Sequence, residues 1–205
     1  MRAPALAAAV LALFAAAPSF AQAPAPSGTP AHIRGTVEKL DGNTLTVKTR
    51  EGPTVSIALA SDYKVATLVK ASLADIKSGD YVASTGVKGT DGKLHAVEVR
   101  IFPESMRGAG EGQSAWDLKP DSMMTNATVT GTAKVANGTM LTVSYKGTTS
   151  DFVVDPDTAV LTRGDGDPSL LKPGAAVFVI ARKQADGSLT AARLYAEKNG
   201  VKPPM

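Results

Sequence analysis

The chain contains no cysteine, and this absence excludes several kinds of site. Disulfide bonds, thiolate metal centres, cysteine nucleophiles and lipid attachment to a cysteine after a signal sequence are all ruled out. The sequence also lacks a Gly-x-Ser-x-Gly segment, which makes a nucleophilic triad improbable. We therefore expect stability to come from apolar burial, and we expect neither enzyme activity nor a cofactor.

Aromatic residues are also scarce, at 5% of the chain. Proteins that bind single-stranded nucleic acid need a positive groove with aromatic rings on which bases stack. Here charges of both signs are spread along the sequence, and the formal net charge is only +3. This composition indicates a solvated surface and argues against a nucleic-acid partner.

Long apolar runs are missing except at the start of the chain. Met1-Arg2 gives a short positive start, an apolar run follows over 3–17, and Ser19-Phe20-Ala21 places small residues where a signal peptidase reads. The run is shorter than the ~20 residues of a membrane-spanning helix. We expect residues 1–21 to be a cleaved signal peptide, the mature protein to be periplasmic without a membrane span, and the Pro/Ala-rich residues 22–30 to form a linker.

The sequence contains an internal repeat. Three short segments of the first half return in the second half at an offset of 95 or 96 residues. They are 41–47 with 137–143, 76–79 with 171–174, and 91–94 with 186–189. A repeat of this regularity predicts two similar units.

Each repeat alternates as antiparallel strands do. Within 44–50, Leu45, Val47 and Thr49 share one face while polar residues occupy the other. Glycines follow acidic residues between such runs, at positions where tight turns need positive φ. Three strands, a short helix over 72–76 with Ser72 and Asp75 as a capping pair, and two more strands follow the order of an OB-like barrel.

We therefore predict an all-β fold of two tandem OB-like small barrels, each with five to six strands and a short helix, joined by a long connector. A single two-sheet sandwich is the alternative. The predicted units are barrel 1 over 31–102, the connector over 103–126, barrel 2 over 127–196 and a tail over 197–205.

The connector 103–126 has no counterpart in the other repeat. It contains the single tryptophan, Trp116, and three of the six methionines. A segment of this length without secondary structure of its own is unusual inside a compact domain, and a plain linker would lack these side chains. Trp116 either fills an open barrel end or the gap between the barrels, or it anchors a contact with a partner.

The connector also carries a resemblance. Its segments 102–108 (Phe-Pro-Glu-Ser-Met-Arg-Gly), Gly110-Glu111-Gly112, Trp116-Asp117-Leu118 and Thr125-Asn126 follow a barrel with Ile-Lys-x-Gly-Asp-Tyr-Val. This arrangement resembles a family of bacterial exported proteins with a domain of unknown function and an OB-like fold. The resemblance covers nearly all of the mature chain, implies a periplasmic two-barrel protein, and supplies no catalytic residues. Some relatives carry metal-transport permease labels, which a chain without a membrane span after its signal does not support.

The two histidines differ in predicted position. His32 shares parity with Arg34 and should face solvent, whereas His95 shares parity with Val97 and Val99 and should start on the apolar face. A lone histidine on such a face is more often a structural group than a ligand or base. A second reading combines His95 with the connector methionines Met106, Met123 and Met124 as soft ligands for Cu(I). Met123 and Met124 are adjacent, however, so in extended chain they point to opposite sides.

The leading hypothesis is a non-enzymatic periplasmic binding or scaffold protein. The connector would act as a clasp and as a contact surface for an unknown periplasmic protein or small ligand, with Glu104, Met106, Arg107 and Trp116 as candidate contact residues. The alternative is a soft-metal protein that handles copper through the connector methionines.

Overall fold

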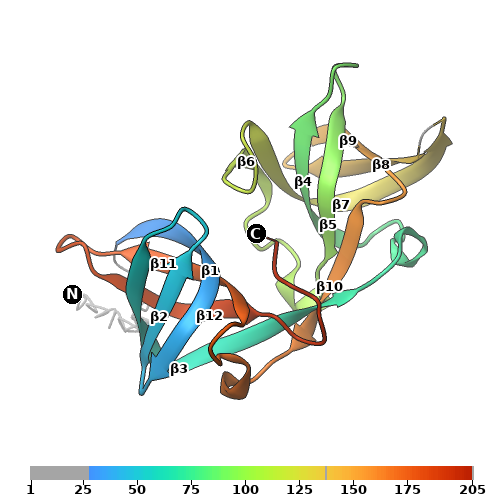
Figure 1. Cartoon of the computed structure of the whole chain (residues 1–205). Helices are drawn as coiled ribbons and strands as arrows, with labels where there is room; N and C mark the ends of the chain where they lie inside the picture. The colour runs from blue at the N-terminus through green and yellow to red at the C-terminus, as the bar shows by residue number, and fades with distance from the viewer. Residues whose placement is uncertain (1–27, 137, 205) are drawn as a thin grey trace, which may run out of the picture.

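The computed structural model describes residues 28–136 and 138–204, and most of this backbone forms strands (Figure 1). The strands are β1 (Thr29–Asp41), β2 (Thr44–Thr49), β3 (Thr54–Lys70), β4 (Tyr81–Lys88), β5 (Leu94–Ile101), β6 (Gly112–Trp116), β7 (Ser122–Val135), β8 (Gly138–Tyr145), β9 (Thr148–Val154), β10 (Ala159–Asp165), β11 (Ala176–Lys183) and β12 (Leu189–Ala196). The predicted signal peptide lies outside the described residues. The predicted linker ended at Pro30, but Thr29 and Pro30 already belong to β1 and pair with β11.

The strands close two five-stranded barrels, as the fold prediction stated. In the first barrel, β1 pairs with β2 and β11, and β3 pairs with β2 and β12, while β11 and β12 pair with each other. In the second barrel, β4 pairs with β5 and β7, and β9 pairs with β8 and β5, while β7 and β8 pair with each other. Closed rings leave few exposed strand edges.

The two repeats exchange strands, which differs from the expected boundaries 31–102 and 127–196. The first barrel takes β1, β2 and β3 from the first repeat but β11 and β12 from the second. The second barrel takes β7, β8 and β9 from the second repeat but β4 and β5 from the first. Neither barrel is therefore a contiguous stretch of the chain (Figure 1).

The exchange follows from the length of β3, which continues past its own barrel. Its first half pairs with β2, and its last residues, Ala66–Lys70, pair antiparallel with β10. β10 runs the opposite way and also pairs in parallel with β5. β3 carries the chain from the first barrel to the second and β10 carries it back, as Figure 1 shows at its centre.

The predicted short helix is present as a single 3₁₀ turn, Leu73–Asp75. The carboxylate of Asp75 accepts hydrogen bonds from the backbone N–H of Ser72 at 2.7 Å and from its hydroxyl at 2.9 Å. This is the expected capping pair.

Three apolar clusters hold the molecule together. One fills each barrel, around Leu45 and Val177 in the first and around Leu141 and Phe152 in the second. The third lies between the barrels, and we call it the seam: Ala66, Leu68, Leu161, Phe178 and Tyr195, with Trp116 and Val201 packed against them. Strands of both repeats contribute to it.

The connector is more ordered than its sequence predicted. It contains the 3₁₀ turn Glu104–Met106 and the strand β6, and its end from Ser122 onward is the start of β7. β6 pairs with β7 as a hairpin. The expectation of a segment without secondary structure was therefore wrong, because β7 extends beyond the barrel and β6 pairs along that extension.

The predicted tail also has structure. Lys198 and Val201 form an isolated bridge, and the carbonyl oxygen of Pro204 accepts a hydrogen bond from Arg34 of β1. Figure 1 shows the C-terminal segment between the two barrels. Among the described residues, no helix has the length and apolar character needed to cross a membrane.

Candidate functional site in the seam between the barrels

Trp116 packs in the seam, which agrees with the first of its two predicted roles, that of filling the gap between the barrels. The connector hairpin brings its ring to 4.4 Å from the ring of His32 and 6.4 Å from that of Phe178, measured between centroids. Both partners belong to the first barrel. The indole Nε1 is buried and has no hydrogen-bond partner.

Arg34 is the most deeply placed cation of the seam, with 2% of its surface exposed. Its guanidinium carbon lies 4.4 Å above the ring of Phe178, the residue opposite it on β11. Its Nη1 is 2.9 Å from a carboxylate oxygen of Asp117, and its Nε donates to the carbonyl oxygen of Pro204 at 3.2 Å. One buried side chain thus joins the first barrel, the connector and the C-terminal segment.

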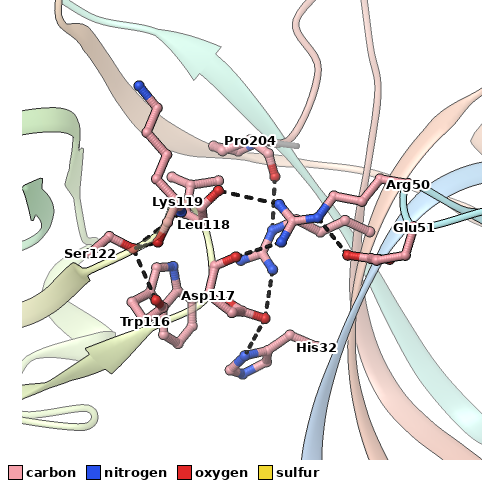
Figure 2. A network of polar contacts seen from close by, with 10 residues as sticks. His32, Arg50, Glu51, Trp116, Asp117, Leu118, Lys119, Ser122 and Pro204 are labelled. Carbon is pink, nitrogen blue, oxygen red and sulfur yellow. Dashed lines mark hydrogen bonds and ion pairs between the residues drawn. The ribbon is translucent and has the colours of Figure 1, made fainter.

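A second arginine holds the turn after β6, as Figure 2 shows. Arg50 donates to the carbonyl oxygens of Asp117 at 2.5 Å and Leu118 at 3.3 Å, and it pairs with Glu51. The hydroxyl of Ser122 donates to the carbonyl oxygen of Trp116 at 2.9 Å. The Arg50 contacts fix the connector against the first barrel, and the Ser122 hydrogen bond closes the turn within the connector.

A buried ion pair lies on the second-barrel side. Glu98 and Arg100, both on β5, are 2% and 8% exposed, and their Oε1 and Nη2 atoms lie 2.7 Å apart. The Arg100 guanidinium is 5.7 Å from the ring centroid of Tyr195. Burial raises the pKa of Glu98, against the opposing charges of Arg100 and Arg34.

Glu98 also has unused hydrogen-bonding capacity beside a pocket. Its Oε2 is buried without a hydrogen-bond partner. The residue lines a pocket of about 310 Å³ that the C-terminal segment covers, which we call the tail pocket. Its lining comprises Lys70, Val97, Glu98, Leu118, Lys119, Ala159, Leu161, Gly200, Val201, Lys202 and Pro204.

His32 occupies a different environment from the predicted one. It does share a strand face with Arg34, but that face is covered by the connector, and the imidazole lies against Trp116 and Phe178. Its Nδ1 is 3.4 Å from Asp117. Burial lowers the pKa of His32, and the nearby carboxylate offsets this only in part. The solvent-facing prediction was wrong because the connector covers the outward face of β1 at this position.

His95 is not on the apolar face. A β-bulge between Thr85/Gly86 of β4 and Glu98/Ala96 of β5 reverses the alternation at Val97. His95 therefore faces outward, with Nε2 3.2 Å from Asp91 and Nδ1 3.4 Å from Asp155. The hydrogen bonds to Asp155 and Asp91 raise its pKa.

The three connector methionines have separate surroundings. The Met106 sulfur accepts from Arg163 at 3.5 Å, and the Met124 sulfur accepts from Thr85 at 3.8 Å. Met123 lies on the other face of β7 from Met124, and its register partners are Gly86 of β4 and Ala115 of β6. Within the described residues, no cluster of three His, Asp or Glu suitable for a metal ion occurs.

Glu104 and Arg107 are exposed and satisfy each other. Arg107 donates to both carboxylate oxygens of Glu104, at 2.5 and 2.6 Å, and to the carbonyl oxygen of Gly79 at 2.9 Å. This pair ties the start of the connector to the loop before β4. Of the four predicted contact residues, Trp116 is the one that lies in the seam.

The comparisons with known proteins identify the repeat. The family described as a domain of unknown function, DUF5666, matches residues 34–100 and again 128–194, together more than half of the chain. This chain belongs to the DUF5666 family. No curated protein and no solved structure matches it.

Each DUF5666 match contains three strands of one barrel and two of the other, so one family unit does not equal one barrel. The connector and the C-terminal segment, which cover the seam, lie outside both matches. Arg34, Glu98 and Arg100 lie inside the first.

Sequence reasoning missed Arg34, Glu98 and Arg100 as site residues. A signal was present in the repeat itself, because Glu98 aligns with Arg193 and Arg100 with Tyr195 at the offset of 95. A charge reversal between equivalent positions marks a place where the two repeats meet different surroundings. Indeed Arg193 is exposed whereas Glu98 is buried.

Proposed function

We propose that this protein is a non-enzymatic binding protein of the bacterial periplasm that holds a small ligand in the seam between its two barrels. The observation that carries the proposal is the buried Oε2 of Glu98, which has no partner and belongs to a side chain lining the tail pocket. Leaving a buried polar atom unpaired costs about 1–3 kcal/mol, more for a charged group. A ligand that supplies a hydrogen bond there recovers part of that cost.

The position of the pocket supports the same proposal. Ligand sites commonly lie where two compact units meet, with mostly apolar walls and few polar groups. The tail pocket has this character, with Leu118, Leu161 and Val201 beside Glu98. Its walls come from β5 of the second barrel, from the linking strands β3 and β10, and from the connector and the C-terminal segment, so all of these must be in place to form it.

The connector acts in this proposal as a clasp. Arg34 and Arg50 hold Asp117 and Leu118, and Leu118 is a wall of the pocket. The exposed edge of β6 provides a contact surface for a second protein. Export to the periplasm rests on the positive start Met1-Arg2, the apolar run over 3–17 and the small residues of Ser19-Phe20-Ala21.

The test is native mass spectrometry on full-length protein recovered from the periplasm of a bacterium that expresses it with its own N-terminus. We expect a processed chain that carries additional mass, released on denaturation. The bound mass should be reduced in Glu98→Gln and unchanged in the exposed-lysine control Lys172→Ala. A processed chain without bound mass, or protein confined to the cytoplasm, would contradict the proposal.

A further inference from the structure

The rim of the tail pocket is positively charged. Lys70, Lys119 and Lys202 line it and are exposed, and they reach it from β3, from the turn after β6 and from the C-terminal segment. Among the described residues, none of these ammonium groups forms an ion pair with a carboxylate. Three unpaired cations at one opening favour an anionic group on the ligand.

The walls are apolar. Leu118 and Leu161 are buried, Val97, Val201 and Pro204 are partly buried, and all line the pocket. A volume of about 310 Å³ is at the lower end of the range for small-molecule sites. The ligand body should therefore be small and apolar.

Glu98 supplies the polar group of the interior. Its Oε1 pairs with Arg100, and its Oε2 has no hydrogen-bond partner but is closed off from solvent, so a ligand hydroxyl can donate to Oε2 once the carboxylate turns toward the pocket. Arg100 and Arg34 both act electrostatically on this carboxyl group. An ammonium group on the ligand would be repelled by these two guanidinium groups, so a neutral hydroxyl is the better donor to Glu98.

From these three features we infer that the tail pocket binds a small apolar carboxylate that carries a hydroxyl group at its other end. The carboxylate would lie among the rim lysines and the hydroxyl would donate to Glu98. This inference rests on the proposed function and adds the chemical class of the ligand.

The probe is 3-(4-hydroxyphenyl)propionate, titrated calorimetrically into the full-length protein. Two analogues each lack one group: 3-phenylpropionate lacks the hydroxyl and 4-ethylphenol lacks the carboxylate. We expect the probe to bind at least about 10-fold more tightly than either analogue, since a hydrogen bond to a charged group contributes about 1.5–3 kcal/mol. Equal binding of all three compounds would overturn the inference.

Variants assign each group of the probe to its partner. Lys119→Ala/Lys202→Ala should weaken the probe and 3-phenylpropionate but not 4-ethylphenol. Glu98→Gln should weaken the probe and 4-ethylphenol but not 3-phenylpropionate. The control Lys39→Ala/Lys172→Ala, which removes two exposed lysines outside the pocket, should change none of the affinities.

The lysine variants keep the inference testable if Glu98→Gln fails to fold, because exposed lysines do not support the core. A double lysine variant that binds the probe as the wild type does would overturn the inference by itself. Failure of the ligand class is distinguishable from failure of the function. A native ligand in the mass spectrum that the probe does not displace refutes the class alone, whereas a chain without bound mass refutes the function.

Discussion

Arg34 on β1 and Asn126 on β7 occupy equivalent positions in the two barrels but form hydrogen bonds with different segments. Arg34 lies opposite Phe178 on β11, and Asn126 lies opposite Ala83 on β4. Arg34 donates to Pro204 in the C-terminal segment, whereas Asn126 donates to Ala109 in the connector at 3.1 Å. The same backbone position thus anchors a different covering segment in each half.

Trp116 allows a matched pair of substitutions. Trp116→Ala should lower the free energy of unfolding by about 2–3 kcal/mol, because it removes a large part of the seam. Trp116→Phe should cost less than about 1.5 kcal/mol, because the ring contacts remain and the lost Nε1 has no hydrogen-bond partner. Urea unfolding followed by circular dichroism measures both. Equal losses would contradict this prediction, because they would mean that a phenyl ring retains none of the packing that the indole ring provides in the seam.

His95 predicts a specific dependence of stability on pH. Its folded-state pKa is raised above 6.5 by hydrogen bonds to Asp155 and Asp91. Protonated His95 therefore stabilises the fold fully below pH 6.5, and this contribution is lost as pH rises through the folded-state pKa. His32 acts oppositely, since its pKa is lowered and its stabilising effect is lost as pH falls.

The comparison that isolates His95 is with His95→Thr, because Thr190 stands at the equivalent place in the second repeat. The difference in melting temperature between wild type and variant should be larger at pH 5.5 than at pH 8.5. A difference that is constant across this range would show that the two carboxylates do not bind the imidazolium.

At the scale of elements, the β1 strand depends on one glycine. At Gly35, β1 passes from pairing with β11 to pairing with β2. A Cβ atom there would lie 2.1 Å from the carbonyl oxygen of Lys48, whereas at Gly131 on β7 a Cβ would meet nothing within 4 Å. Gly35→Ala should therefore destabilise the fold by at least about 3 kcal/mol, and Gly131→Ala by less than about 0.5 kcal/mol.

Chemical unfolding of the two glycine variants beside the wild type checks this prediction. Comparable stability of Gly35→Ala and Gly131→Ala would show that β1 and β2 can move apart near Gly35 without cost.

The strands themselves were predictable from alternation and turn residues, and the capping pair Ser72–Asp75 was predictable from its spacing. The bulge at Val97 was not, because one extra residue in a strand leaves no mark in composition but reverses every side chain beyond it. That single residue explains why His95 was assigned to the wrong face. β6 was missed because Gly112–Trp116 shows no alternation and owes its conformation to β7.

At the scale of the whole molecule, the exchange of strands should make unfolding a single event. Each barrel contains strands of both repeats, and β3 and β10 pair between them. The equivalent core substitutions Val47→Ala in the first barrel and Val143→Ala in the second should each lower the midpoint of urea unfolding. In both variants, tryptophan fluorescence and circular dichroism should report the same shifted midpoint. Two separated transitions in either variant would show that the barrels unfold independently.

The repeat predicted two barrels but not their strand composition. The local pattern of β4 and β5 is the same whether they close the barrel of their own repeat or that of the other. What decides is the extension of β3 beyond its barrel, and the pattern of 63–70 shows a strand without showing its neighbour. The surroundings that bury the Glu98–Arg100 pair depend on that choice, so the candidate site could not be predicted before the topology was known.

The exchange of strands also determines when the first barrel can close during synthesis of the chain. The first barrel begins at Thr29, yet its ring closes only with β11 and β12, which end at Ala196. A chain emerging from the ribosome therefore carries the sheet of β1, β2 and β3 for more than 100 residues, from Lys70 to Ala176, before synthesis of the closing strands β11 and β12 begins. The first barrel therefore cannot close until β12 has been synthesised, and under the export proposed above this delay would keep the chain unfolded for passage through a secretion channel.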